Sequence, residues 1–442
     1  MFKRKIYRQM VEWKMQSQGR TALLIQGARR VGKSTVAREF AKREYKSFLI
    51  IDFSNAPSEV VNLFRDMHDL DFFFLQLQLL CRVRLYERES LIIFDDVQLQ
   101  PLARQAIKYL VADGRYDYLE IGSMLPLRGN VENILIPSEE ERLYMFPLDY
   151  EEFLWARGDE TTAPLLREHF QEGRGFGADV HRRQMQDFRL YMLVGGMPQA
   201  VETLLEANDF ARIDHVKRDI LTLYENDFHT IDRFGRASQL FDAIPGELGK
   251  HSSRYQVSKV ILRQRAKDVR DIVADMTDSM TVLPAFRVGE PGPRMALGRD
   301  VDRFKLYLAD TDLFVTLVFK DRAFTENIIY EKLLFGKLPA KLGCLYDNIV
   351  AQTFRAAGHN LFYHTFSSDT SNHTYAIDFL LAKKHEICPV EVKSAAAKPH
   401  AALDRFRAKY GECVAESYVV CGKDYAEADG VKYVPFYLAH LL

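Results

Sequence analysis

A chain of 442 residues is too long for one ordinary domain, so we expect roughly two to four modules, each with its own core. The composition, 47% hydrophobic and 27% charged, is typical of a soluble globular protein. With 60 basic against 61 acidic residues, the net charge indicates no partner, so any surface for nucleic acid must be a local patch.

The cysteines and the apolar runs indicate the compartment. The five cysteines are odd in number and scattered, with no C-x-x-C pair, which argues against a disulfide framework and against a zinc site. No apolar run approaches the roughly 18 residues of a membrane-spanning helix, and the first residues lack the apolar stretch of a signal peptide. We therefore expect a cytoplasmic protein with no membrane partner.

The first distinctive pattern begins at residue 27. Residues 6–18 predict a helix and residues 21–26 an apolar strand, after which Gly27–Thr35 fits the pattern G-x-x-x-x-G-K-[ST]. A helix-compatible run follows. Because strand, loop and helix are all present, a phosphate-binding loop is favoured over a chance glycine-rich turn.

The chemistry of this loop predicts its ligand. Gly27 and Gly32 allow backbone N–H groups to converge on a phosphate chain, and Lys33 would face the β- and γ-phosphates. The hydroxyl of Ser34 would coordinate Mg²⁺. We therefore predict that the chain binds ATP with Mg²⁺. The predicted nucleotide-binding residues are Gly27, Ala28, Arg29, Arg30, Val31, Gly32, Lys33, Ser34 and Thr35.

A pair of carboxylates follows a buried strand. Residues 48–53 and 91–96 both read as short apolar strands, and the second ends in Asp95 and Asp96. Asp95 is predicted to hold Mg²⁺ at the strand's C-terminal edge, and Asp96 to orient and deprotonate the attacking water. Two aspartates at a strand end also occur in solvated turns, but the upstream loop favours the catalytic interpretation.

Two further strands complete a sheet. Residues 118–123 end in Ser123, which we predict to sense the γ-phosphate or the water, although serine is also an ordinary helix N-cap. Residues 142–146 would be a fifth strand. One strand between the loop and the acid pair suggests an additional-strand P-loop fold, AAA-like, with a parallel sheet and helices on both faces. Residues 147–155 then open a helical lid, which the glycines and proline of 195–198 interrupt.

The middle of the chain resembles a winged helix. Helices are expected from about residue 215, and residues 281–288 can pair with residues 304–309. Residues 258–270 carry five basic side chains and are expected to form a basic helix. This helix could follow a nucleic-acid backbone, or it could be a solvated face or a docking site for a protein.

The last part of the chain holds a second group of charges. Residues 374–381 and 387–393 read as strands, and their alternation places Asp378 on one face and Glu391 beside Lys393. This spacing is the PD-(D/E)XK arrangement, in which Asp378 and Glu391 hold a divalent metal, Mg²⁺ or Mn²⁺, and Lys393 activates the attacking water. Asp347, on a preceding helix, is a plausible further ligand. Solvated charges on an open sheet face are the alternative.

Taken together, these patterns predict four domains. The expected division is an AAA-type ATPase domain over 1–156, a helical lid over 157–214, a winged-helix-like domain over 215–322, and an α/β PD-(D/E)XK nuclease-like domain over 323–442.

The chain resembles a family over nearly its full length: prokaryotic AAA-type ATPases with a C-terminal domain of unknown function that has a PD-(D/E)XK nuclease-like fold. The resemblance implies a winged helix in the middle and a nuclease-like cluster of Asp347, Asp378, Glu391 and Lys393. The family commonly has Asp-Glu where this chain has Asp95-Asp96, and the shorter carboxylate predicts slow hydrolysis. The matching stretches are 27–35, 94–98, 121–123, 145–155, 195–198, 305–310, 345–352, 377–380 and 389–394.

The sequence supports two functions. In the first, ATP hydrolysis drives or gates a metal-dependent nuclease acting on DNA or RNA. In the second, the protein is a nucleotide-controlled switch whose nuclease-like domain only binds nucleic acid or a protein. The presence of all three charges, Asp378, Glu391 and Lys393, favours the first. A homo-oligomer is left open by the sequence.

Overall fold

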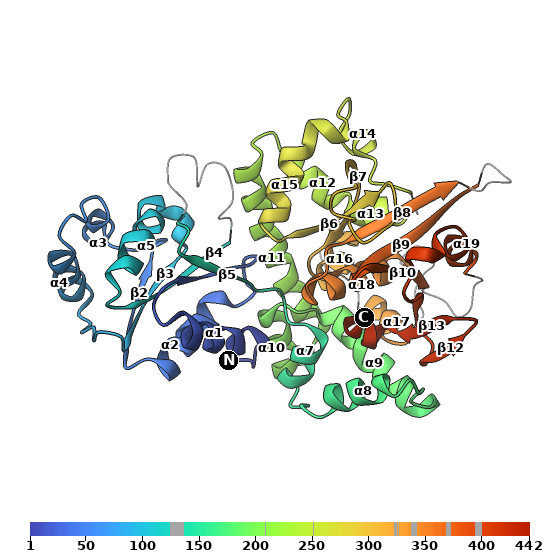
Figure 1. The fold of residues 1–442 in the computed structure, drawn as a ribbon, viewed down its shortest axis with the longest axis horizontal. Coiled ribbons are helices and arrows are strands. Elements are labelled where there is room, and N and C mark those ends of the chain that lie inside the picture. The colour runs from blue at the N-terminus through green and yellow to red at the C-terminus, as the bar shows by residue number, and fades with distance from the viewer. Residues whose placement is uncertain are drawn as a thin grey trace. The chain divides into compact units, whose positions relative to one another are not determined.

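The structure, a computed structural model, describes residues 1–123, 137–207, 209–250, 252–321, 325, 327–336, 343–367, 373–393 and 400–442. The chain divides into two units, residues 1–146 with 278–280 and residues 147–277 with 281–442 (Figure 1). None of the helices in these ranges is both long enough and apolar enough to cross a bilayer.

The first unit is a parallel sheet between helices. Its described strands lie in the order β2-β3-β4-β1-β5, and every pairing is parallel. β4 lies between the strand that precedes the loop and the strand that carries the acid pair, as the additional-strand prediction requires. The elements are α1 (Lys5–Ser17), β1 (Ala22–Gln26), α2 (Lys33–Glu44), β2 (Ser47–Asp52), α3 (Ser58–Leu63), α4 (Leu70–Cys81), β3 (Ser90–Asp95), α5 (Pro101–Asp113), β4 (Asp117–Gly122) and β5 (Glu140–Tyr144).

The central strands of this sheet are buried on both faces. All five residues of β1 and all six of β4 are buried, including the carboxyl groups of Asp117 and Glu120 in β4. One face contributes Leu24, Ile92 and Phe94 to a core cluster that includes side chains of α4 and α5. Helix α2 packs against β2, β3 and β4. Burial on both faces is the physical reason that β1, with four consecutive apolar residues, lacks a two-residue alternation.

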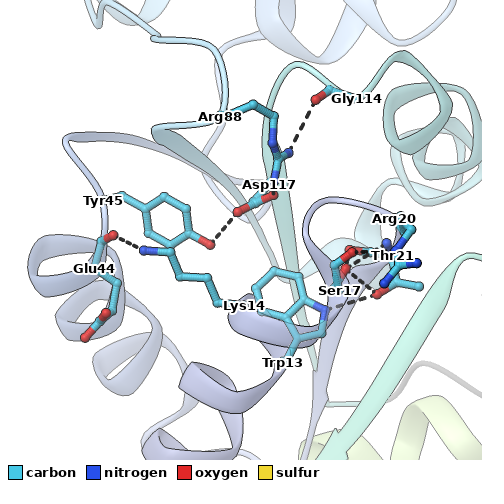
Figure 2. A network of polar contacts seen from close by, with 10 residues as sticks. All are labelled: Trp13, Lys14, Ser17, Arg20, Thr21, Glu44, Tyr45, Arg88, Gly114 and Asp117. Carbon is cyan, nitrogen blue, oxygen red and sulfur yellow. Dashed lines mark hydrogen bonds and ion pairs between the residues drawn. The ribbon is translucent and has the colours of Figure 1, made fainter.

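Polar contacts fix the N-terminal ends of the strands (Figure 2). Asp117 begins β4 and accepts the hydroxyl of Tyr45 at 2.8 Å and the guanidinium of Arg88 at 2.8 Å. Nearby, Nε1 of Trp13 donates to Oγ1 of Thr21 at 3.2 Å, just before β1. Because parallel strands begin at the same edge, this network lies opposite the edge that carries the nucleotide loop and has a structural role.

The second unit combines helices with a mixed sheet. The helices are α7 (Tyr150–Ala156), α8 (Thr162–Gln171), α9 (Ala178–Val194), α10 (Pro198–Ala207), α11 (Phe210–Ile231), α12 (Arg236–Asp242), α13 (Ile244–Leu248), α14 (Val257–Val260), α15 (Arg270–Asp278), α16 (Thr311–Val318), α17 (Asn327–Leu334), α18 (Cys344–Ala356) and α19 (Ala401–Tyr410). The strands are β6 (Val282–Val288), β7 (Arg299–Leu308), β8 (Phe362–Ser367), β9 (Thr374–Lys383), β10 (Glu386–Lys393), β11 (Tyr418–Cys421), β12 (Ala426–Ala428) and β13 (Val431–Pro435).

One sheet joins the strands of the middle and last parts of the chain. Within the described ranges its order is β12-β13-β11-β10-β9-β8-β6-β7. The predicted pairing of β6 with β7 is confirmed, with Leu283 opposite Tyr307. β6 also pairs with β8, where Phe286 lies opposite Phe362. The winged-helix and nuclease-like domains of the four-domain prediction therefore share a sheet, and that division stays a prediction.

The expected basic helix over residues 258–270 is wrong. Helix α14 ends at Val260, and Arg263 adopts a left-handed conformation with φ 64°. A 3₁₀ turn then covers Ala266–Val269, where the carboxylate of Asp268 accepts the backbone N–H of Arg265 at 2.8 Å. This local side-chain bond stabilises a new helical start, so the basic residues do not share one helix face.

Candidate functional site

The nucleotide loop, residues 27–35, has the close contacts that its glycines permit. A Cβ added to Gly27 would lie 2.4 Å from the carbonyl oxygen of Met145, which follows β5. Gly32 has φ 96°, a conformation that glycine adopts without strain, and Arg30 has φ 70°. The guanidinium of Arg4 donates to the carbonyl oxygen of Val31 at 2.8 Å. The loop is therefore held by β5 and by the segment before α1.

Lys33 is bound within the loop. Its Nζ donates to the carbonyl oxygens of Gly27 at 2.9 Å and Ala28 at 2.8 Å, and the residue is 8% exposed. The lysine begins α2, where the N-terminal backbone N–H groups are available to an anion. A triphosphate could replace the two carbonyl oxygens as the acceptor of this ammonium.

The two residues predicted to hold Mg²⁺, Ser34 and Asp95, lie near one another. The side chain of Ser34 lies close enough to the carboxylate of Asp95, at the end of β3, to affect its pKa. Burial raises the pKa of Asp95, the Ser34 side chain opposes this rise, and the charges of Asp96 and Asp52 add to it. Mg²⁺ at phosphate sites is usually held by one or two protein groups together with the phosphates, and this pair fits that pattern.

Asp52 was missed by the sequence analysis. It ends β2 directly opposite Asp95, although its Oδ1 already accepts the backbone N–H of Ser54 at 2.9 Å. The predicted strand over residues 48–53 could have revealed Asp52, because residues at the C-terminal ends of neighbouring parallel strands meet at one edge of the sheet.

Asp96 is oriented by its neighbours. It has φ 52°, its N–H donates to Oδ1 of Asp95 at 3.1 Å, and its own Oδ1 accepts Nε2 of Gln98 at 2.9 Å. Gln98, also missed by the sequence analysis, thus fixes the rotamer of the predicted base. Ser123, at the end of β4, is 2% exposed, and its Oγ has no hydrogen-bond partner among the described residues.

The C-terminal charges line one cavity. This C-terminal cavity has a volume of about 570 Å³, and its lining includes Asp347 of α18, Asp378 of β9, and Glu391 and Lys393 of β10. β9 and β10 are antiparallel with Phe379 opposite Val390, a register that places Asp378 across from Glu391. All four predicted side chains therefore come together.

Internal partners occupy these carboxylates. Nζ of Lys393 lies 2.5 Å from Oε1 of Glu391, and Oδ2 of Asp378 accepts the backbone N–H of Val392 at 2.9 Å. Glu391 is 5% exposed; burial raises its pKa, and the bond from Lys393 opposes that rise. Its Oε2 has no hydrogen-bond partner within the described chain.

Lys305 is a cavity residue that the sequence analysis did not single out. It comes from β7, and its Nζ lies 4.0 Å from Oδ1 of Asp378. The pKa of Asp347 is raised to about 8, first by burial and then by the charge of Asp378, against the attraction of Lys305 and Lys393. Only the sheet that joins β7 to β9 could reveal Lys305, because more than 70 residues separate it from Asp378.

The three predicted metal ligands of the cavity do not form a ready metal site. The described residues contain no group of three or more His, Cys, Asp or Glu side chains arranged to hold a metal ion. Asp378 and Glu391 are instead neutralised by lysines.

Family models match three parts of the chain. Residues 19–154 match a model described as an AAA domain. Residues 185–323 and 342–438 match two domains of unknown function, DUF8612 and DUF4143. The N-terminal part is therefore an AAA-type ATPase domain, which implies a nucleotide ligand. The matches beyond it give no activity.

Comparisons over longer stretches add little. No curated protein matches the chain. The Orc1 protein of Aeropyrum pernix, determined in complex with DNA, is 14% identical, with 76% of this chain and 92% of that chain covered at a TM-score of 0.29. Protein VC1899 from Vibrio cholerae is 9% identical, with 95% of each chain covered at a TM-score of 0.18. Both TM-scores are too low to show a shared fold.

Proposed function

We propose that the protein hydrolyses ATP with Mg²⁺ and that its nucleotide state controls a C-terminal cavity that binds nucleic-acid phosphodiesters. The observation that supports the ATPase best is that the side chains of Ser34 and Asp95 lie near one another, with the buried Lys33 at the start of the same helix as Ser34. A hydroxyl, a carboxylate and an ammonium then converge where a Mg²⁺-bound triphosphate is expected.

Each residue of the nucleotide loop has a defined part in this proposal. Lys33 exchanges the carbonyl oxygens of Gly27 and Ala28 for phosphate oxygens. Asp96, held by Gln98, orients the attacking water and accepts its proton. Ser123 offers a buried hydroxyl at the adjacent strand end, suited to contact the γ-phosphate. Bound Mg²⁺ would neutralise charge on the phosphates.

The geometry best supports a C-terminal cavity that binds nucleic acid without cleaving it. Lys305 and Lys393 bring positive charge to a cavity in which the described residues form no metal-holding group. A phosphodiester can accept hydrogen bonds from both ammonium groups.

Metal-dependent cleavage is the second candidate function. Its supporting observation is that Asp347, Asp378, Glu391 and Lys393 all line one cavity. For cleavage, a metal would have to bind the other oxygen of Glu391, Oε2, which has no hydrogen-bond partner within the described chain, while Oε1 stays on Lys393.

Two assays test these proposals. ATP hydrolysis should require Mg²⁺ and should be lost in Lys33→Ala. Single- and double-stranded DNA and RNA are then incubated with Mg²⁺ or Mn²⁺, with and without ATP, using wild type and Glu391→Gln. Nucleic acid that is bound but stays intact supports binding without cleavage. Metal-dependent cleavage products that are lost in Glu391→Gln support the nuclease. An absence of ATP hydrolysis would contradict the ATPase proposal.

A further inference from the structure

A second cavity lies beside the C-terminal cavity and is called here the basic cavity. It also has a volume of about 570 Å³, and residues 252–255 line both cavities. Its remaining lining comes from residues 256–258, from residues 265–267, and from Asp302 of β7. The two cavities therefore share a wall.

The two cavities differ in charge. Arg254, Arg265 and Lys267 line the basic cavity, against one carboxylate, Asp302. That carboxylate is bound by Arg270 through contacts of 2.8 and 2.6 Å, so its charge is already compensated. Nε of Arg265 lies 3.7 Å from Oδ2 of Asp268, whereas in the part of the chain that the structure describes neither Arg254 nor Lys267 has a carboxylate at ion-pair distance.

The C-terminal cavity has no such excess of positive charge. Three basic side chains, Arg254, Lys305 and Lys393, share its lining with four carboxyl groups, Glu247, Asp347, Asp378 and Glu391. A polyanion therefore gains little net attraction there, although a single phosphodiester can bind to the lysines. Attraction for the other phosphates of a nucleic-acid strand must therefore come from residues outside this cavity.

The break in the expected basic helix explains how these side chains reach a cavity. The chain leaves α14 at Val260 and turns through the left-handed Arg263, after which Arg265 is extended and Lys267 lies in the 3₁₀ turn. Both are exposed, as is Arg254. A continuous helix would instead distribute them around its surface.

We propose that the basic cavity binds the sugar-phosphate backbone of a nucleic-acid strand next to the phosphodiester in the C-terminal cavity, with Arg254, Arg265 and Lys267 as its phosphate ligands. The inference rests on the proposed function in one respect, that the C-terminal cavity takes a phosphodiester. Contacts to phosphate carry no sequence information, so binding is independent of sequence.

The test measures the binding of the full-length chain to short fluorescein-labelled oligonucleotides by fluorescence anisotropy, in EDTA so that no metal-dependent cleavage occurs. Arg265→Ala/Lys267→Ala should weaken binding by at least about tenfold, because two charge-assisted hydrogen bonds are lost. The slope of log K against log salt should fall by about 1.4 for a single strand. Comparing the affinities for single-stranded DNA, single-stranded RNA and duplex DNA shows which kind of nucleic acid the basic cavity binds.

The matched control is Arg212→Ala/Arg233→Ala, which removes two exposed arginines of the same unit that line neither cavity. It should leave affinity and salt slope unchanged. Circular dichroism and ATP hydrolysis establish that each variant is folded.

Three outcomes overturn the proposal: unchanged affinity in the folded Arg265→Ala/Lys267→Ala variant, an equal loss in the control, or no binding of any oligonucleotide by the wild type. Failure of the proposed function looks different. If Lys305→Met/Lys393→Met leaves affinity unchanged while Arg265→Ala/Lys267→Ala weakens it, the basic cavity binds nucleic acid and the C-terminal cavity does not.

Discussion

Lys33 carries the most specific charge of the nucleotide loop. Lys33→Ala should weaken ATP binding by about tenfold to a hundredfold, the range expected when one charge-assisted hydrogen bond of about 1.5–3 kcal/mol is lost. Titration with a fluorescent ATP analogue measures this change. Lys42→Ala, at an exposed position of the same helix, is the control and should bind normally. Equal affinities in the two variants would contradict the assignment.

Substitution of Asp96 should separate ATP binding from ATP hydrolysis. Asn tolerates the left-handed φ of 52° as well as Asp does, so Asp96→Asn should keep the fold and the ATP affinity. Without a proton acceptor, the rate of hydrolysis should fall by about 10² or more. Steady-state phosphate release measures the rate.

Asp95→Asn should behave differently, with weaker Mg²⁺-dependent binding, because the carboxylate beside Ser34 loses its charge. Full turnover in Asp96→Asn would mean that another residue activates the water.

At the scale of elements, the close approach of β1 and β5 restricts the nucleotide loop. Gly27→Ala would place a Cβ 2.4 Å from a backbone oxygen, so the loop or β5 must shift. We expect a loss of about 1–3 kcal/mol in the free energy of unfolding, together with weaker ATP binding. Urea denaturation measures the first effect. Gly246→Ala, where nothing lies within 4 Å of the added Cβ, should be neutral or stabilising. A neutral Gly27→Ala would show that this contact is not restrictive.

The junction of α18 with β9 should make stability depend on pH. The pKa of Asp347 rises from an ordinary 3.8 to about 8, so in this window the folded state binds more protons than the unfolded state. The stability contributed by this carboxyl is complete below pH 3.8 and is lost as the pH rises through about 8. Differential scanning calorimetry should therefore show the Tm of Asp347→Asn gaining on wild type between pH 5 and pH 9.

The control for this effect is Glu206→Gln, an exposed carboxyl of α10, whose Tm difference from wild type should not change with pH. A constant Tm difference for Asp347→Asn as well would contradict the raised pKa.

At the scale of the whole molecule, the shared sheet determines which fragments can fold. A fragment of residues 325–442 lacks β6 and β7, so β8 loses its neighbour. It also leaves the buried amide of Asn348 without the backbone groups of Leu308, which it contacts at 2.8 and 3.1 Å. We expect this fragment to lack a cooperative thermal transition, whereas residues 147–442 should have one. Circular dichroism melting and limited proteolysis compare them. A cooperative transition in the short fragment would show that the last strands fold independently.

The sequence by itself determined the nucleotide loop and the order of the elements around it. Gly27, Gly32, Lys33 and Ser34 are close in the chain, and their conformations follow from local backbone preferences, so a short pattern is enough. The same holds for the two alternating strands with Asp378 and Glu391, because a two-residue period defines which side chains share a face.

Only the tertiary structure decided which distant segments meet. Lys305 joins the C-terminal cavity, and Asp52 lies beside Asp95, because strand order brings them together, and strand order depends on burial over the whole sheet. The basic segment near Arg265 was misjudged since the local bond to Asp268 competes with helix continuation, and helix propensity alone does not include that bond. Burial, which raises the pKa of Asp347, is likewise a property of packing that no spacing reveals.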